Sequence, residues 1–118
     1  MTLKGKTAVI TGSNSGIGLG VAEELARAGA DVVINSFTDS AEDHALAARI
    51  AAGHGVKARY IQADMSKPDD CRALVEKAGG CDILVNNAGI QFVAPIEEFP
   101  VEKWNAILAI NLSSSFHT

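Results

Sequence analysis

The 118-residue sequence has only two cysteines, few aromatic residues and no long hydrophobic run. Cys71 and Cys81 are too few for a disulfide framework, and no signal-peptide-like apolar region opens the chain, so we expect a cytoplasmic protein. Every apolar run is far shorter than the ~18 residues of a membrane-spanning helix. Ten basic residues oppose 14 acidic ones, for a net charge of −4, and Lys and Arg form no cluster. This charge pattern argues against nucleic acid and membrane partners.

Short apolar runs alternate with segments of helical spacing along the whole chain. The runs predict strands at residues 8–10, 32–34, 58–63 and 82–85. The helices are expected between them: one ending before Gly29, one from Ser40 to Gly53, one from Ser66–Pro68 to Gly79, and one from Pro100 onward. Strands that alternate with helices of this kind imply right-handed crossovers and a parallel sheet. The fold class is therefore α/β, with an expected strand order of 3-2-1-4.

The last predicted helix has no capping residue or glycine before Thr118. We therefore expect residues 1–118 to be the β-α-β-α-β-α-β-α portion of a larger domain. A fourth strand at the edge of the sheet would also lack its neighbour, and bare edges invite aggregation. The alternative is a non-catalytic dinucleotide-binding or interaction module that ends at Thr118.

A glycine-rich segment, Gly12-Ser13-Asn14-Ser15-Gly16-Ile17-Gly18, separates the first predicted strand from the first helix. Gly12 permits a tight turn, Gly16 lets the backbone approach a pyrophosphate, and Gly18 lets helix and strand pack closely. The helix N-terminus offers free N–H donors and the positive end of the helix dipole to phosphates. The segment therefore predicts a dinucleotide site.

Cofactor choice depends on the end of the second strand, which reads Asn35-Ser36-Phe37. No carboxylate is there for the ribose 2′-hydroxyl, and no Lys or Arg is there or at Ser15 for a 2′-phosphate, so NAD is preferred over NADP. Phe37 is either a partly buried hydrophobic residue or packs near the adenosine. Asp64, after the third strand, could accept the adenine amino group or act as a turn residue. The three histidines share no metal-ligand spacing, so no metal site is expected.

Four landmarks together resemble the short-chain dehydrogenase/reductase family. They are Thr11-Gly12-xxx-Gly16-Ile17-Gly18, Asp64, Asn86-Asn87-Ala88-Gly89 and Asn111, in family order and spacing. The resemblance implies a Rossmann-type doubly wound sheet and hydride transfer between a nicotinamide and a hydroxyl or carbonyl group. It also implies an oligomer, a homodimer or homotetramer, in which the helix carrying Trp104 and Leu108 forms the main subunit interface.

The resemblance also implies roles for individual residues. Gly12, Asn14, Gly16 and Ile17 would hold the pyrophosphate and adjoining ribose, and Phe37, Ala63, Asp64 and Met65 would frame the adenosine. Asn87, Gly89 and Ile110 would lie near the nicotinamide-side ribose. Asn111 matches the helix asparagine of the catalytic tetrad, which in the family holds a water in the proton relay.

The segment from Asn87 to Pro100 resembles a narrower group of the family, the bacterial enzymes that interconvert D-3-hydroxybutyrate and acetoacetate. There the glutamine matching Gln91 contacts the substrate carboxylate, whereas in this sequence Phe92 replaces the histidine that usually follows. A 3-oxoacyl reductase or a sugar dehydrogenase is the alternative within the family, and a solvated loop amide is the alternative for Gln91. The substrate would be a small hydroxy acid or ketone.

The family's catalytic Ser and Tyr-x-x-x-Lys pair are absent from these 118 residues. The single tyrosine, Tyr60, lies in the third predicted strand and has no Lys four residues later. Without a phenol made acidic by a neighbouring ammonium, the alcohol keeps its proton. We therefore predict that a polypeptide of these 118 residues alone has no useful dehydrogenase activity.

Overall fold

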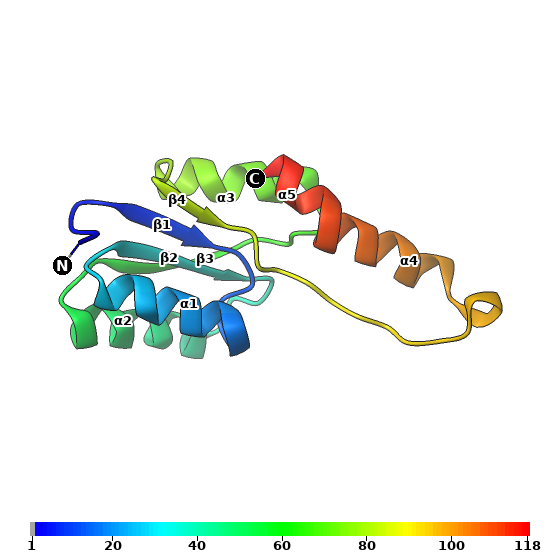
Figure 1. Ribbon diagram of the computed structural model, residues 1–118, viewed down its shortest axis with the longest axis horizontal. Coiled ribbons are helices and arrows are strands. Elements are labelled where there is room, and N and C mark those ends of the chain that lie inside the picture. Colours follow the sequence, from blue (N-terminus) through cyan, green and yellow to red (C-terminus); the bar gives the residue numbers. More distant parts are fainter. Residues whose placement is uncertain (1) are drawn as a thin grey trace.

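The computed structural model describes residues 2–118, and its four strands form one parallel sheet in the order β3-β2-β1-β4 (Figure 1). This order confirms the α/β fold and the topology predicted from the sequence. The strands are β1 (Thr7–Ile10), β2 (Asp31–Ser36), β3 (Ala58–Gln62) and β4 (Ile83–Val85). Each crossover carries a helix, as parallel neighbours require.

Helices cover both faces of the sheet, so the central strands are apolar on both sides. Ala8 and Ile10 of β1 pack in one core with α1 (Gly16–Arg27) and α2 (Ala41–His54). Val9, which points to the opposite face, packs in a second core with α3 (Pro68–Ala78). Figure 1 shows α1 and α2 below the sheet and α3 above it.

Local signals set the helix boundaries. Ser40 and Asp43 form a reciprocal capping box at the start of α2, and Pro68 opens α3, as expected. Gly79 ends α3 in the left-handed conformation (φ 82°). The prediction that Gly53 closes α2 is wrong. The helix runs on to His54, and Gly55 provides the left-handed C-cap (φ 66°).

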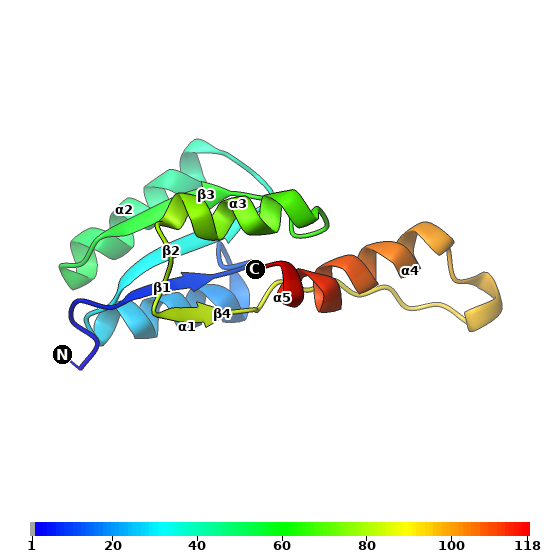
Figure 2. The same cartoon turned by 90° about the horizontal axis from the view of Figure 1, so that it is seen from above.

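The last predicted helix, from Pro100 onward, is divided into three parts: α4 (Val101–Leu108), a π-helical turn (Ala109–Ser113) and α5 (Ser114–His117), which lies beside α3. A 3₁₀ turn (Ile96–Glu98) precedes α4. Residues 90–108 extend away from the sheet as an arm (Figures 1 and 2). The arm accounts for the molecule's 51 × 26 × 23 Å extents. Large apolar side chains are exposed along and beside it: Val93, Ile96, Val101, Trp104, Leu112 and Phe116.

Candidate dinucleotide site

The glycine-rich turn lies against the loop that follows β4. A Cβ on Gly12 would come within 2.9 Å of the Cα of Ala88, and Gly12 has a positive φ of 60°. A Cβ on Gly18 would lie 2.5 Å from both Nδ2 of Asn87 and the carbonyl oxygen of Gly12. Gly16 also has a positive φ (61°), but no atom lies within 4 Å of its Cβ position. Two glycines therefore permit close packing, while the third leaves open space at the start of α1.

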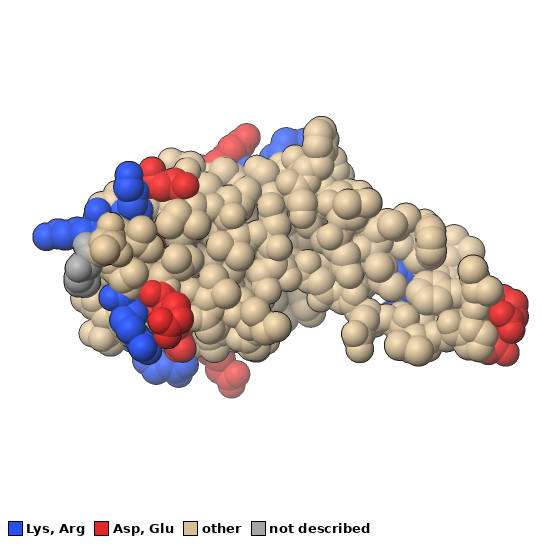
Figure 3. All heavy atoms as spheres, in the orientation of Figure 1, with Lys and Arg blue, Asp and Glu red and all other residues tan. Residues whose placement is uncertain are grey.

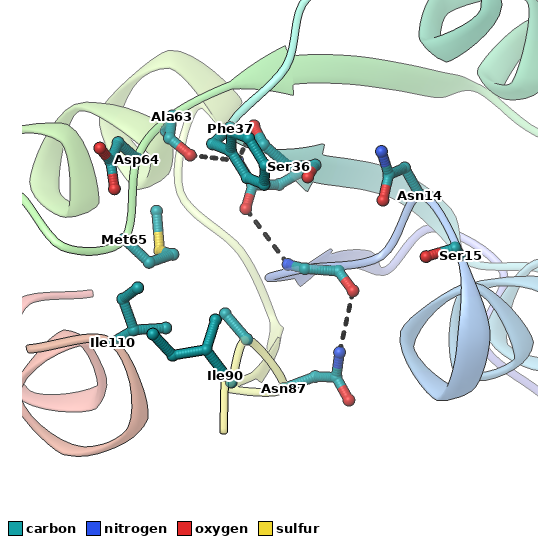
Figure 4. A pocket seen from close by; sticks show the side chains of 14 residues that line it. Asn14, Ser15, Ser36, Phe37, Ala63, Asp64, Met65, Asn87, Ile90 and Ile110 are labelled. Carbon is teal, nitrogen blue, oxygen red and sulfur yellow. Dashed lines mark hydrogen bonds between the residues drawn. The ribbon is translucent and has the colours of Figure 1, made fainter. Parts of the chain in front are cut away.

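Asn87 and Thr11 join the two loops. The hydroxyl of Thr11 accepts hydrogen bonds from the backbone N–H groups of Asn87 (3.0 Å) and Ala88 (2.9 Å). The Asn87 amide in turn donates to the carbonyls of Thr11 (3.1 Å) and Gly12 (3.0 Å). One of these bonds is drawn as a dashed line at Asn87 in Figure 4. Both hydrogens of this amide are thus used to fix the turn.

A buried network holds the same turn against β2. Asn35 is fully buried, and its side chain accepts a hydrogen bond from the N–H of Gly12 (3.2 Å) while donating to the carbonyl of Ile61 (2.9 Å). The hydroxyl of Ser13, also buried, accepts from the backbone N–H of Asn35 (2.9 Å) and donates to the Ile10 carbonyl (2.7 Å). Asn35 therefore serves as a structural residue, with both its amide oxygen and its amide nitrogen bonded to backbone groups. Sequence reasoning missed this role, since nothing adjacent in the chain marks these partners.

These contacts surround a cleft of about 270 Å³ at the carboxyl ends of the strands. In open α/β sheets, ligands bind at this edge, where the strand order reverses. Figure 4 shows Asn14 and Ser15 on one side, Asp64 and Met65 on the opposite side, and Ile90 and Ile110 below. The lining residues are Gly12, Asn14, Ser15, Asn35, Ser36, Phe37, Ala63, Asp64, Met65, Asn87, Ala88, Gly89, Ile90 and Ile110.

The structure brings together most of the predicted cofactor residues and adds others. Nine of them line the cleft: Gly12, Asn14, Phe37, Ala63, Asp64, Met65, Asn87, Gly89 and Ile110. Gly16 and Ile17 lie outside it, and Ile17 is 81% exposed at the start of α1. Gln91 also lies outside the lining, exposed in the arm. Ser15, Asn35, Ser36, Ala88 and Ile90 line the cleft without having been predicted as binding residues.

Asp64 is the one ionisable side chain among the described residues that line the cleft. Its Oδ1 accepts hydrogen bonds from the hydroxyl (2.6 Å) and the N–H (2.9 Å) of Ser66. These bonds lower the pKa of the Asp64 carboxyl, so it is ionised near neutral pH. The cleft therefore offers an anionic acceptor and has no Lys or Arg in its lining. In Figure 3, Lys and Arg gather mainly at the end of the molecule that holds the N-terminus.

Asn111 lies in the π-helical turn and is bonded to the loop after β4. Its Oδ1 accepts from the N–H of Ile90, and its Nδ2 donates to the carbonyl of the same residue, both at 2.8 Å. Its side chain thus fixes the backbone next to Gly89. π-Helical turns of this kind often occur at functional sites.

Tyr60 lies outside the cleft, so its hydroxyl does not face a ligand bound there. Its hydroxyl donates to the carbonyl of Thr38, and burial raises the pKa of its phenol. A general acid/base needs a pKa near the working pH. The geometry agrees with the expectation that Tyr60 is not the catalytic tyrosine.

Taken with this geometry, the comparisons place the chain in a family. Residues 6–118 match the family model described as short chain dehydrogenase, and the chain belongs to that family. A dinucleotide cofactor goes with that membership. Within residues 2–118, every helix is too short or too polar to span a bilayer. The same residues bring no three His, Cys, Asp or Glu side chains together as metal ligands would.

Two similar relatives carry the name D-beta-hydroxybutyrate dehydrogenase. The one from Cupriavidus necator is 54% identical over 98% of this chain and 46% of its own length. The one from Rhizobium meliloti is 53% identical over 96% of this chain and 45% of its own. The chain thus spans about half the length of the curated relatives it matches. A Bacillus subtilis 2-dehydro-3-deoxy-D-gluconate 5-dehydrogenase is 42% identical over 98% of this chain and 45% of its own length.

Solved structures agree with the fold. A blue fluorescent protein from a metagenomic library, solved in complex with NADPH, has a TM-score of 0.93 and 35% identity over 99% of this chain and 49% of its own. The L-sorbose reductase of Gluconobacter frateurii, solved with NADPH and L-sorbose, has a TM-score of 0.92 and 36% identity over 99% of this chain and 46% of its own.

Proposed function

We propose that this chain supplies the dinucleotide-binding half of an NAD-dependent oxidoreductase that interconverts D-3-hydroxybutyrate and acetoacetate. The observation that carries the proposal is the likeness to two D-beta-hydroxybutyrate dehydrogenases, above half identity across almost the whole chain. The cleft fits the cofactor chemically, because it joins a glycine-rich turn, a helix N-terminus and one carboxylate.

The preference for NAD rests on charge. A 2′-phosphate would bring up to two negative charges toward Ser36 and Phe37, and the described lining offers no Lys or Arg to meet them. The ionised Asp64 adds a negative charge to the same cleft. The 2′-hydroxyl of NAD carries no charge and has no such penalty.

A second candidate is an NADP-dependent reductase of a sugar or related ketone. The likeness to an L-sorbose reductase solved with NADPH favours it, and the likeness to a 2-dehydro-3-deoxy-D-gluconate 5-dehydrogenase favours a sugar-derived substrate. Both share less identity with this chain than the D-beta-hydroxybutyrate dehydrogenases do.

Within this proposal, residues in and beside the cleft contact different parts of the cofactor. The open space at Gly16 and the first N–H groups of α1 receive the pyrophosphate, and Ile17 lies beside it on the exposed surface. Phe37, which is 70% exposed, covers the adenosine, and the ionised Asp64 accepts from the adenine amino group. The nicotinamide, when bound, supplies the hydride acceptor. Asn87, Gly89 and Ile110 lie on the nicotinamide side.

The substrate-binding end of the site would lie beyond Ile90, whose backbone N–H and carbonyl are both hydrogen-bonded to the side chain of Asn111. We propose that Gln91 donates its amide to the carboxylate of the hydroxy acid, since a neutral amide donates without bringing its own charge. Asn111 would keep the turn in place for this contact and for a water of the proton relay. Tyr60 would not act as the proton acceptor, because it is buried and its hydroxyl donates to the carbonyl of Thr38.

The exposed apolar side chains of α4 suggest how copies assemble. Val101 is 68% exposed and Trp104 is 57% exposed, more than isolated surface helices usually show together. We propose that this face is covered in a homodimer or homotetramer. Light scattering on the protein expressed from its complete reading frame checks this, and a monomer would contradict it.

Initial rates on the same protein test the activity. We expect NAD to be reduced with D-3-hydroxybutyrate, and more slowly with the L enantiomer, NADP or sugar alcohols. Reduction of a sugar or 3-oxoacyl substrate with NADPH, without activity on D-3-hydroxybutyrate, would favour the second candidate. A matched assay on the 118-residue polypeptide should show no turnover above the no-enzyme rate.

A further inference from the structure

A carboxylate behind the cleft connects two of its walls. Asp43 lies at the third position of α2 and is 6% exposed. Its Oδ1 accepts a hydrogen bond from Nδ2 of Asn14 in the glycine-rich loop (3.1 Å), and its Oδ2 accepts one from the hydroxyl of Thr38 (2.9 Å). Asn14 lines the cleft, and Thr38 directly follows Phe37, which also lines it. One buried side chain thus holds both segments.

Further bonds fix the carboxylate itself. Oδ2 of Asp43 also accepts from the N–H and the hydroxyl of Ser40, both at 3.0 Å. The backbone hydrogen bond from Ser40 is the main reason that the pKa of Asp43 is lowered to about 2. The side chain is therefore fully charged near neutral pH. Asp39, which precedes α2, contacts Nε2 of His44 instead (2.6 Å).

The end of β2 lacks the acidic residue that dinucleotide sites commonly present to the adenosine ribose. Asn35 is committed to the buried network, and Ser36 and Phe37 carry no charge. Asp43 of α2 instead brings a charge to Asn14, which lines the same cleft as Ser36 and Phe37. The charge therefore lies on α2, one side chain away from the cleft, and not at the end of β2 as in the common dinucleotide site.

We propose that Asp43 is a positioning and specificity-determining residue of the dinucleotide site. It holds Asn14 and the segment of Phe37 and Thr38 on either side of the adenosine ribose, and its charge disfavours a 2′-phosphate between them. The inference rests on the proposed function, in which this cleft binds a nicotinamide dinucleotide.

The charge acts because it is buried. Solvent and salt screen an exposed carboxylate, but screen a buried one much less. No Lys or Arg in the described lining offsets it. Across one intervening side chain, we expect it to weaken NADPH binding relative to NADH on the order of tenfold.

Binding of NADH and NADPH, followed by the fluorescence of the reduced nicotinamide, tests this on the protein expressed from its complete reading frame. Asp43→Asn removes the charge and keeps the size of the side chain. Asp43→Glu keeps the charge, and Glu is common at this third helical position of capping boxes. Glu42→Gln removes an exposed charge from the neighbouring position of the same helix and is the matched control.

We expect Asp43→Asn to lower the ratio of the NADPH to the NADH dissociation constant about tenfold, as the buried charge is lost. Asp43→Glu and Glu42→Gln should leave the ratio within about twofold, because the first keeps the buried charge and the second removes only an exposed, screened one. An unchanged ratio in Asp43→Asn, or the same change in Glu42→Gln, would overturn the inference. If thermal melting shows that Asp43→Asn is unfolded, Asp43→Ser, whose neutral hydroxyl can still accept a hydrogen bond at this position, gives the same comparison.

The two proposals fail in different ways. A wild-type protein that binds NADPH more tightly than NADH would contradict the proposed use of NAD, but the change caused by Asp43→Asn would still decide the role of Asp43. A wild-type protein that binds neither dinucleotide would contradict both proposals.

Discussion

Two glycines on the same helix should respond in opposite ways to one methyl group. Gly18 and Gly20 both lie in α1, two residues apart. At Gly18 the new Cβ would be 2.5 Å from Nδ2 of Asn87 and from the Gly12 carbonyl oxygen. At Gly20, which is exposed, it would meet nothing within 4 Å.

The expected magnitudes follow from these distances. Forcing a methyl group into a packed site costs about 1–3 kcal/mol. Displacing the Asn87 amide from the carbonyls of Thr11 and Gly12 adds about 1 kcal/mol for each bond lost. Better helix propensity returns at most about 1 kcal/mol. Gly18→Ala should therefore destabilise the protein by about 2–4 kcal/mol, while Gly20→Ala should stabilise it by about 0.5–1 kcal/mol.

Urea unfolding of the two variants and the wild type measures both changes under the same conditions. The midpoint should fall for Gly18→Ala and rise slightly for Gly20→Ala, with similar slopes. NADH binding should weaken only in Gly18→Ala, because the turn that it displaces lines the cleft. If Gly18→Ala were as stable as Gly20→Ala, the close contact between the glycine-rich turn and the loop after β4 would be refuted.

Three other predictions follow from the same contacts. The folded-state pKa of Asp43 is lowered from 3.8 to about 2, so the stability that its carboxylate contributes is full above pH 3.8 and is lost as the pH falls through about 2. Acid unfolding between these two pH values should therefore be steeper for the wild type than for Asp43→Asn. Asn35→Leu leaves the Gly12 N–H and the Ile61 carbonyl unpaired in the core and should cost about 3 kcal/mol in urea unfolding; a neutral result would refute the network. In the protein expressed from its complete reading frame, Tyr60→Phe should leave kcat for the oxidation of D-3-hydroxybutyrate unchanged. A large loss of kcat without loss of stability would make Tyr60 catalytic.

The sequence was most informative where a local rule decides the structure. The strand order could be predicted because parallel strands need helical crossovers of fixed hand. The capping box of Ser40 and Asp43 could be predicted from its spacing alone. The same spacing could not reveal that the Asp43 carboxylate also accepts from Asn14, which is 29 residues away.

Other features depend on contacts that a single sequence does not display. Asn35 ends a β-branched run and reads as the exposed end of a strand, yet it is fully buried among partners 23 and 26 residues distant. The π-helical turn at Asn111 was missed because the apolar spacing from Val101 to Phe116 fits one continuous α-helix. The direction in which Ile17 points depends on the turn before it, and the motif alone did not specify it.

The central claim is that the cleft at the carboxyl ends of β1, β2 and β4 binds a nicotinamide dinucleotide. Titration of the isotope-labelled protein with NADH, followed by amide chemical shifts, tests it most directly. We predict saturable shifts centred on Gly12, Phe37, Asp64 and Gly89, with little change along the arm. Saturable shifts confined to another surface, or none at all, would contradict the account.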